Sequence, residues 1–353
     1  MAAYTAIDDA EVYFRIKLYT GNGTDDTGIV FDTTDTTMQP DLVWIKNRNS
    51  TNEHNLVNSV VGATKYLHSN LTQAETTAAN SLQSFDSNGF TLGTNANFNT
   101  DTNTYVAWCW KAGTSFSNDA SATSVGSIDS TGSTSSDSGF SIVSYTGTGA
   151  DGTIAHNLGA APTVIIQKNR DEVQPWWVFH SEVGAGGQLR LNDNVAAGTD
   201  GGVLWNSTVP TSTVFSVGDN DGINGDGDKC IAYCFVEKQG FSKFGAYTGD
   251  GDADGPFVYT GFRPAMVIIK STGLNSWELY DIKRNTFNPT AKAVFSDGNG
   301  AEYDYTNRID ILSNGFKARS TSSGVNGSGV SYTYMAFAES PFVNSEGVPT
   351  NAR

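Results

Sequence analysis

The sequence predicts an all-β protein made of three tandem β-sandwich units of the jelly-roll or lectin-like type. Glycine accounts for 38 of the 353 residues and charged residues for only 16%, whereas an average protein has about 7% glycine and about 25% charged residues. Thirteen Asn-Gly or Asp-Gly pairs offer the positive φ angles that tight hairpin turns require. Short runs of β-branched and aromatic residues lie between these pairs, which is the pattern of strands joined by polar turns.

The chain also repeats itself three times. Each copy opens with a segment that starts at Phe and ends in Tyr-Thr-Gly, continues with a Pro that a Lys follows six residues later, and closes on a strand of aromatic and small residues. From the Pro to the closing strand the spacing is 65, 68 and 68 residues. The segments begin at Phe14, Pro40 and Tyr105 in the first copy, at Phe140, Pro162 and Cys230 in the second, and at Phe241, Pro264 and Tyr332 in the third. Because a period of about 100 residues exceeds that of solenoid or propeller repeats, we expect whole domains in tandem, each filling its own interior.

The repeats divide the chain into units at residues 1–113, 139–238 and 239–353. Residues 114–138 are mostly Ser, Thr, Asp, Gly and Ala, a composition typical of a flexible or extended linker. The second and third units have no spacer and are expected to pack rigidly together, which makes the first unit the candidate anchor. Residues 71–82 are the best helix candidate, although their threonines are weak helix formers.

An excess of acidic residues excludes two classes of partner. Asp and Glu number 37 and Lys and Arg 21, so the formal net charge is −16. Such a chain lacks the clustered cations that nucleic-acid phosphates or anionic lipids require, and no apolar run reaches the ~18 residues of a membrane span.

The N-terminal segment lacks the cationic region of a signal peptide, and three cysteines are too few for a disulfide scaffold. We therefore expect the chain to fold in a reducing cytoplasm.

Four aspartates in one turn-rich segment are candidate calcium ligands. Asp219, Asp221, Asp226 and Asp228 alternate with Asn and Gly, and Ca²⁺ takes about six to eight oxygen ligands, often from flexible acidic loops. The segment lacks the bidentate Glu of an EF-hand, and Asp and Asn also favour turns by binding their own backbone. A calcium site and a plain turn both stay open for this segment.

Three tryptophans are candidate ligand-binding residues. Trp176, Trp177 and Trp277 follow the Pro-to-Lys segments of the second and third copies at similar distances. Tryptophans so placed could pack in the core, form a flat platform on which sugar rings stack, or form an interface hot spot.

No residue is predicted to be catalytic. The chain has no G-x-S-x-G nucleophile elbow, and its one G-x-G-x-x-G stretch, residues 147–152, precedes no helix that could receive a pyrophosphate. Cys230 and Cys234 have no second ligand pair for zinc, and Cys234 shares its repeat position with Cys109, so we expect them to fill the core. Because 37 acidic residues offer many carboxylate pairs, a glycan hydrolase stays open as an alternative.

Several phrases resemble one protein family over nearly the whole chain. They occupy residues 39–49, 61–68, 84–94, 105–114, 240–250, 255–264, 312–320 and 334–342. These phrases are similar to those of the tandem-repeat, tail-fibre-like virion structural proteins of marine tailed bacteriophages, including phages of cyanobacteria. The resemblance implies a non-enzymatic virion component built from sandwich repeats, and it carries no catalytic or ligand residues to transfer.

On this basis we expect a bacteriophage virion structural protein, either a tail-fibre or appendage component or a capsid-surface decoration. It would be made in the host cytoplasm and exposed on the particle as a homo-oligomer. Its expected partners are other virion proteins and a host surface glycan, which repeated weak sites would bind by avidity. Neither nucleic-acid binding nor membrane insertion is expected, nor any cofactor apart from Ca²⁺. The alternative from another class is a carbohydrate-binding module of a surface or secreted protein.

Overall fold

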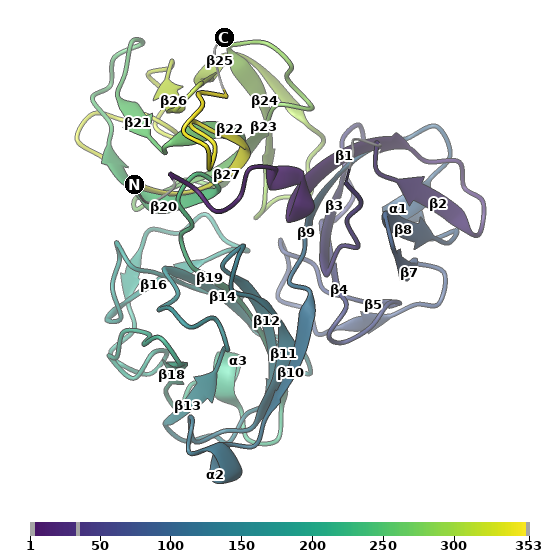
Figure 1. Cartoon of the computed structure of the whole chain (residues 1–353), viewed down its shortest axis with the longest axis vertical. Coiled ribbons are helices and arrows are strands. Elements are labelled where there is room, and N and C mark those ends of the chain that lie inside the picture. The colour runs from purple at the N-terminus through teal and green to yellow at the C-terminus, as the bar shows by residue number, and fades with distance from the viewer. Residues whose placement is uncertain (1–3, 33–35, 351–353) are drawn as a thin grey trace.

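The computed structural model describes residues 4–32 and 36–350 and is all-β, as the sequence predicts. Its strands gather into three lobes around a common centre (Figure 1), called here lobe 1 (within residues 4–113), lobe 2 (114–238) and lobe 3 (239–350). Single-turn helices lie between the strands: η1 (Ala10–Val12), α1 (Ala96–Asn99), α2 (Ala120–Thr123) and α3 (Asp221–Asn224). Within the described ranges, none of the helices has the length and apolar character needed to cross a membrane.

Lobe 1 consists of two facing sheets. A four-stranded sheet has the order β1-β9-β3-β4, a three-stranded sheet has the order β2-β8-β7, and β5 and β6 form a separate pair. The strands are β1 (Phe14–Thr20), β2 (Thr27–Val30), β3 (Leu42–Asn47), β4 (Asn55–Asn58), β5 (Lys65–Tyr66), β6 (Thr76–Thr77), β7 (Leu82–Asp86), β8 (Gly89–Leu92) and β9 (Thr104–Trp110). Val43, Phe90 and Ala107, from both sheets, belong to a hydrophobic core that lies within this lobe.

Lobe 2 has one long sheet and one short one. The long sheet has the order β10-β11-β12-β19-β14-β15-β16-β17, and β13 pairs with β18. The strands are β10 (Thr114–Asn118), β11 (Ser130–Ser135), β12 (Phe140–Thr146), β13 (Gly152–Ala155), β14 (Val164–Asn169), β15 (Trp177–His180), β16 (Gly187–Arg190), β17 (Gly198–Thr199), β18 (Val214–Val217) and β19 (Lys229–Phe235). Val143, Ile165 and Phe215 belong to the hydrophobic core between the two sheets.

In lobe 3 a single sheet curls around the interior. Its order is β20-β27-β22-β23-β24-β25-β26-β21. The strands are β20 (Ser242–Thr248), β21 (Phe257–Tyr259), β22 (Phe262–Ser271), β23 (Trp277–Asp281), β24 (Thr290–Phe295), β25 (Tyr303–Leu312), β26 (Gly315–Ala318) and β27 (Ser331–Pro341).

One strand order occurs in all three lobes: β1-β9-β3-β4, β12-β19-β14-β15 and β20-β27-β22-β23. In each case the opening strand of the repeat pairs with its closing strand, which pairs in turn with the strand that follows the Pro. The register matches as well, because the residue two positions after each Pro pairs with an aromatic residue of the closing strand. These pairs are Leu42 with Trp110, Val164 with Phe235 and Met266 with Phe337. Positions in the three lobes can therefore be matched residue by residue.

The repeated Tyr-Thr-Gly segment fastens the end of the first strand to the turn before the closing strand. Each Tyr hydroxyl donates a hydrogen bond to a backbone carbonyl of that turn, and each Gly packs so close to the same turn that a Cβ would lie 2.2 to 2.4 Å from a carbonyl oxygen. The hydroxyl bonds join Tyr19 to Phe98 (2.8 Å), Tyr145 to Ile223 (2.5 Å) and Tyr247 to Val325 (2.6 Å). Only Gly fits this close approach of two backbone segments, which explains why the motif recurs.

The expectation that each unit fills only its own interior is wrong. The central strands are apolar on both faces, and one face of each sheet contributes to a single hydrophobic core shared by all three lobes. Trp108, Tyr233 and Met335, which occupy the same position in their closing strands, all belong to it. Around the centre of the molecule, Phe337 lies 5.5 Å from Trp110 and 5.8 Å from Phe235 between ring centroids. The apolar second face thus buries itself against the neighbouring lobes, since leaving it in water is unfavourable.

Residues 114–138 are not a linker. They form β10 and β11, which extend the long sheet of lobe 2 beyond β12, and the short helix α2 lies in the exposed connection between these two strands. Ser and Thr suit these strands because their side chains tolerate a half-exposed pleated surface, and the backbone groups find partners in the neighbouring strand. Lobe 1 is therefore not set apart from the others, and the reason for regarding it as an anchor disappears.

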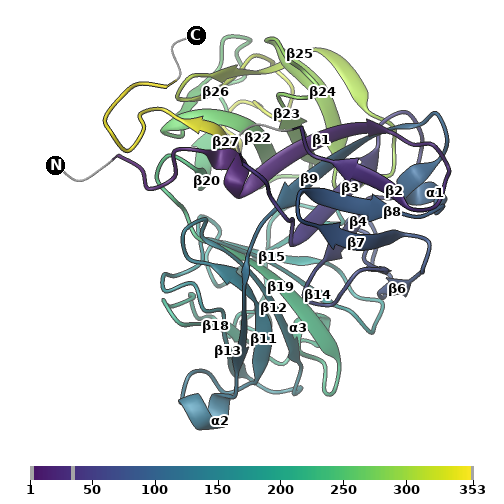
Figure 2. The same ribbon diagram turned by 45° about the vertical axis from the view of Figure 1, so that its right-hand side comes forward.

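The segment predicted to be a helix, residues 71–82, contains the strand β6 and otherwise irregular structure. Figure 2 shows the N-terminal segment running from lobe 3 to the start of β1. There the Tyr4 hydroxyl donates to the Gly261 carbonyl at 2.8 Å, and the Thr5 hydroxyl donates to the Gln239 carbonyl at 2.9 Å. The first residues described therefore tie lobe 1 to lobe 3.

Candidate functional site: the three junctions between lobes

The polar groups that recur in the three lobes meet at the junctions between them. The matching positions occur in a cyclic order, because lobe 1 contacts lobe 3, lobe 2 contacts lobe 1 and lobe 3 contacts lobe 2 through the same residues of each repeat. We refer to these surfaces as the 1–3, 2–1 and 3–2 junctions.

The lysine of each Pro-to-Lys segment is a buried cation. Lys46, Lys168 and Lys270 are 0% exposed, and each Nζ donates to the carbonyl of the last residue of its own strand and to a carbonyl in the loop that follows. Two of them also reach a neighbouring lobe, since Lys46 donates to Asn299 at 3.2 Å and Lys270 donates to Val195 at 3.0 Å. The lysines thereby fix the loops that form the junctions.

Burial lowers the pKa of each of these three lysines to about 8, from an ordinary value of 10.5. A buried ammonium is costly unless hydrogen bonds replace its water. In the 1–3 and 3–2 junctions, carbonyls from two lobes supply that replacement.

Backbone bonds join the lobes just beyond these lysines, with the same geometry at each junction. The amide of Glu302 donates to the Arg48 carbonyl and the amide of Glu75 to the Arg170 carbonyl, both at 2.7 Å. At the 3–2 junction the amide of Ala197 donates to the Thr272 carbonyl at 2.9 Å. These bonds depend on no side chain and therefore persist where the sequence differs.

An ion pair reinforces two of the three junctions at this position. Arg48 binds Glu302 with two hydrogen bonds of 3.0 and 3.1 Å, and Arg170 binds Glu75 with two of 2.8 Å. Such bidentate pairing is the strong form of an arginine–carboxylate contact. Thr272 and Ala197 occupy the same positions at the 3–2 junction, where the charged pair is replaced by small residues.

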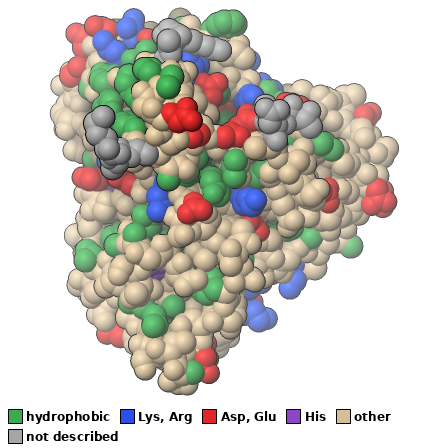
Figure 3. Space-filling view, viewed as in Figure 1, with side chains coloured by type: hydrophobic (Ala, Val, Ile, Leu, Met, Phe, Trp, Pro, Cys, Tyr) green, Lys and Arg blue, Asp and Glu red, His purple; other side chains and the backbone are tan. Residues whose placement is uncertain are grey.

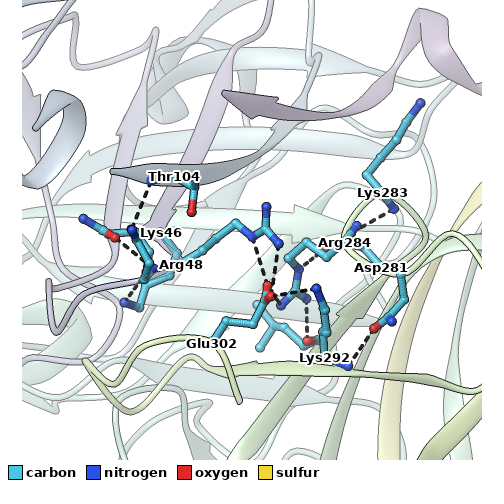
Figure 4. A network of polar contacts seen from close by, with 12 residues as sticks. Lys46, Arg48, Thr104, Asp281, Lys283, Arg284, Lys292 and Glu302 are labelled. Atoms are coloured by element: carbon cyan, nitrogen blue, oxygen red, sulfur yellow. Dashed lines mark hydrogen bonds and ion pairs between the residues drawn. The ribbon is translucent and has the colours of Figure 1, made fainter. Parts of the chain in front are cut away.

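The 1–3 junction carries a larger charged network, shown in Figure 4. Glu302 also faces Arg284 at 3.3 Å and Lys292 at 3.7 Å, so that three cations surround one carboxylate. Arg284 pairs with Asp281 at 2.5 Å, and both side chains are 0% exposed. Asp281 also accepts the indole N–H of Trp108 at 3.1 Å. The network thus runs from the lobe 3 loops to the shared core.

The tryptophans predicted as a sugar-stacking platform are enclosed within the protein, so this prediction is corrected. Trp176, Trp177 and Trp277 are 0%, 6% and 2% exposed. Trp176 donates through Nε1 to the His68 carbonyl of lobe 1 at 2.8 Å, and Trp277 donates to the Arg190 carbonyl of lobe 2 at 2.7 Å. Two of these tryptophans therefore tie one lobe to the next, and Trp177 packs in the lobe 2 core.

At the matching position lobe 1 has His54 instead of Trp. Its Nδ1 accepts the indole N–H of Trp44 at 2.9 Å. Burial holds the pKa of His54 well below its ordinary value, with Lys46 acting in the same direction. The imidazole is therefore neutral and replaces an indole at the 1–3 junction.

A second set of matched contacts lies closer to the centre. Asn58 donates to the Tyr233 hydroxyl at 3.0 Å across the 2–1 junction, and His180 lies 3.4 Å from the Tyr334 carbonyl across the 3–2 junction. Asp281 occupies the same position in the 1–3 junction. Burial lowers the pKa of His180 to about 4, so the His180 contact is made by a neutral ring. Buried polar contacts of this kind favour one arrangement of the lobes over others.

The four candidate calcium ligands lie around helix α3 at the end of lobe 2. Asp219, Asp221 and Asp226 are exposed, and Asp228 accepts a hydrogen bond from Asn169 Nδ2 at 2.7 Å. Among the described residues, no group of three or more His, Cys, Asp or Glu side chains is placed so that it could hold a metal ion. Calcium binding at this loop stays a prediction. The three cysteines are free and buried, as the core-packing interpretation requires.

The sequence analysis overlooked an asparagine in each repeat. Asn99, Asn224 and Asn326 are 0% exposed, and each Oδ1 accepts, at 2.9 Å, the backbone N–H of the residue that follows the glycine of the Tyr-Thr-Gly segment. The signal was present, because each asparagine lies six residues before the start of the closing strand (105 − 99, 230 − 224 and 332 − 326). The ion pairs had no comparable signal, since their partners are distant in the sequence.

The 2–1 junction opens outwards into two adjoining pockets of about 430 and 490 Å³. Ser144, Arg170 and Lys229 line both of them, and the hairpin β10–β11 forms one wall. Arg170 is already paired with Glu75, so this groove offers hydroxyl groups together with charges of both signs, among them Lys229 and Asp171.

The comparisons with known proteins agree with treating the three lobes as one unit. The model of a family described as "Domain of unknown function (DUF7483)" matches residues 9–341. A search of the curated proteins finds no match to this chain. Because the family match runs through all three lobes and both sets of junction contacts, the chain belongs to the DUF7483 family.

Proposed function

We propose that this chain is a structural component of a bacteriophage particle, exposed on its surface as a tail appendage or a capsid decoration. The choice of particle comes from the sequence resemblance. The structural role is carried by one observation, namely that the same contacts join the lobes at all three junctions and close them into a ring around a shared core. No lobe can move away from the others without exposing buried indoles, lysines and apolar strands, which is costly. A body of this kind suits a passive, rigid role.

We also infer that the three lobes derive from one β-sandwich copied twice. The recurring strand order, the Tyr-Thr-Gly attachment with its asparagine and the buried lysine support this origin. Lobes 1 and 2 keep two facing sheets, whereas in lobe 3 the strands β24 and β25 join the corresponding sheets into one.

The surface fits a component that faces water and other proteins. Figure 3 shows one face on which uncharged side chains and backbone predominate and charges of both signs are scattered. A net charge of −16 keeps such a surface soluble. We propose other virion proteins as the main partners and a homo-oligomer as the assembled form, with any further copies meeting through the outer surfaces of the lobes.

The test is the location of the chain. Particles purified from infected cells should contain it in a fixed ratio to the major capsid protein, and electron cryo-microscopy should show a three-lobed density at their surface. Finding the chain in the infected-cell lysate but not in intact particles would overturn the proposal. The homo-oligomer is tested separately by the mass of the purified chain, which should be a multiple of 37.6 kDa; a monomer contradicts that part alone.

The alternative function, a carbohydrate-binding module, is favoured by a different observation. Lobe 3 exposes the aromatic rings of Phe257, Tyr259, Phe287 and Tyr303.

A further inference from the structure

Lobe 3 carries all the aromatic side chains that rank among the exposed large hydrophobic residues of the described chain. These are Phe257, Tyr259, Phe287 and Tyr303, which are 46%, 54%, 83% and 45% exposed. The corresponding exposed residues of lobes 1 and 2 are all valines. An exposed aromatic residue has a solvation cost that packing does not offset, so this asymmetry calls for an explanation.

Tyr303 is not required by the fold. Tyr303 pairs with Ala293 on β24, and the register of the other lobes places Thr76 and Gly198 at the matching position. Two residues further on, Tyr305 corresponds to Ala78 and Asp200. Lobes 1 and 2 form the same strand pair with small or polar residues, so the exposed Tyr303 serves something other than folding, whereas Tyr305 is half-buried and also packs against the shared core.

The rings form a continuous strip beside the 1–3 junction. The ring centroids of Phe295 and Tyr303 are 4.9 Å apart, and those of Tyr303 and Tyr305 are 6.0 Å apart with an interplanar angle of 11°. The guanidinium of Arg308 lies 3.6 Å from the centroid of the Tyr305 ring and holds that end of the strip in place. Glu302, the residue before Tyr303, is fixed by its bonds to Arg48. The strip is thus anchored at both ends.

Polar side chains with free hydrogen-bonding capacity alternate with the rings. Asp304, Thr306 and Asn307 are exposed, and within residues 4–32 and 36–350 none of the three side chains has a hydrogen-bond or ion-pair partner. Along residues 303–307 the side chains are thus two tyrosine rings with a carboxylate between them, followed by a hydroxyl group and an amide group. Tyrosines supply rigid contact area at a low cost in conformational entropy, and short polar side chains supply adaptable hydrogen bonds.

We propose that residues 303–307, together with Phe295, form a binding strip for a neutral oligosaccharide. The apolar C–H face of a sugar ring can pack on the tyrosine rings, and the Asn307 amide, which lies on the same face of the strand, can bind its hydroxyls. Asp304 and Thr306 point to the other face of the strand. Nucleobases also stack on aromatic rings, but the free carboxylate of Asp304 and a net charge of −16 oppose a phosphate backbone. The same charges oppose sulfated and other anionic glycans, so a neutral glycan fits the strip best. This site goes beyond the particle role and does not depend on it.

The test uses the full chain on an array of short neutral oligosaccharides with their sulfated and sialylated counterparts, followed by calorimetry on the best neutral ligand. The decisive variant combines Tyr303→Thr with Tyr305→Ala, the residues that lobe 1 has at these positions. Because Tyr305 also packs against the shared core and Arg308, Tyr303→Thr alone is the variant expected to keep the melting temperature. Both variants should raise Kd, the double variant by about tenfold or more.

The matched control is Phe257→Thr, which removes an exposed aromatic residue elsewhere in lobe 3 in favour of the residue that lobe 2 has there, Thr153. It should leave binding unchanged. Binding to no neutral glycan, equal binding by the double variant, or binding confined to anionic glycans or to another protein would each overturn the proposal. None of these results bears on whether the chain is found in particles, so the two proposals can fail independently.

Discussion

The 2–1 and 3–2 junctions join lobes through the same backbone positions but with different side chains. In the 2–1 junction Arg170 binds Glu75 across a mostly buried surface, whereas Thr272 and Ala197 meet at the 3–2 junction. The backbone bond between these positions differs by only 0.2 Å, 2.7 against 2.9 Å. The geometry of the junction is therefore independent of the ion pair.

This comparison distinguishes the contacts that occur at every junction of the ring from those that occur at only some of the junctions. The backbone bond occurs at every junction, and an indole or imidazole occupies another matched position at each. A buried lysine lies beside each junction, but only Lys46 and Lys270 donate across it. The ion pair occurs at two of the junctions. This pattern agrees with the general finding that a buried ion pair contributes little net stability compared with a well-packed apolar replacement, although breaking one by removing a single partner is costly.

The largest effect is expected from Asp281→Ala in the 1–3 junction. The substitution leaves the Trp108 N–H and two backbone N–H groups without their acceptor and removes the Asp281 partner of Arg284. We expect the free energy of unfolding to fall by about 3–5 kcal/mol, measured by urea denaturation. Asp219→Ala, at an exposed aspartate, is the control and should change it by less than about 0.5 kcal/mol. Similar losses for both variants would mean that the network does not hold the junction.

Trp176→Ala should rank next, because it removes an enclosed indole and its bond to the His68 carbonyl. Truncation of a buried tryptophan typically costs about 3–5 kcal/mol. Trp176→His introduces the residue that lobe 1 has at this position, His54, and should lose clearly less, as an imidazole can retain a ring and an N–H donor. Equal losses for the two variants would show that the three junctions are not interchangeable. Urea denaturation followed by far-UV circular dichroism reports both values.

The buried lysines make the free energy of unfolding depend on pH. The folded-state pKa of Lys270 is about 8 and the ordinary value is 10.5, so between these values the unfolded chain binds more protons than the folded one. Stability from this group therefore rises as the pH increases from about 8 to 10.5. Lys270→Met abolishes that gain and leaves three carbonyls without their donor, at a cost of about 1–3 kcal/mol near pH 7.

The measurement is the difference in unfolding free energy between the original chain and Lys270→Met, taken at several pH values. Tyrosines and other lysines titrate in both proteins and cancel in this difference. The gap should widen towards pH 10.5. A gap that narrows over the same range would contradict a lowered pKa for this buried lysine.

The sequence predicted the structure most accurately where a motif makes its contacts within its own lobe. The spacing of Tyr-Thr-Gly, Pro, Lys and closing strand placed the central strands correctly, because each motif fixes a turn or a register nearby. The strand at 104–110 is buried on both faces, but nothing in its sequence says which neighbour covers the second face. Residues 114–138 were misjudged for a related reason, since Ser- and Thr-rich segments form strands only when a sheet edge such as β12 is there to pair with them.

The candidate sites were harder to predict because their partners are distant. The spacing of Trp176 and Trp277 drew attention to them, but each binds a backbone carbonyl in another lobe. Because every residue has a backbone carbonyl, the sequence does not show which one is the acceptor. Tyr303 and Tyr305 were not predicted from the sequence. The prediction rested on residues that recur in all three copies, and these two tyrosines occur only in lobe 3.

The smallest effect is expected from building the missing ion pair into the 3–2 junction, which tests directly how this junction differs from the 2–1 junction. Thr272→Arg combined with Ala197→Glu would place at the 3–2 junction the pair that the 2–1 junction already has. The backbone positions are matched, so the side chains can meet without rearrangement. The desolvation of two charges nearly cancels their attraction, and we expect a change in unfolding free energy of no more than about 1 kcal/mol. Each single variant should be less stable than the pair, because it leaves a charge at a mostly buried surface without its partner. A double-mutant cycle in urea isolates this coupling. A large gain from the pair would mean that the ion pairs themselves determine the ring, and the backbone bonds and indoles would then be the secondary contacts.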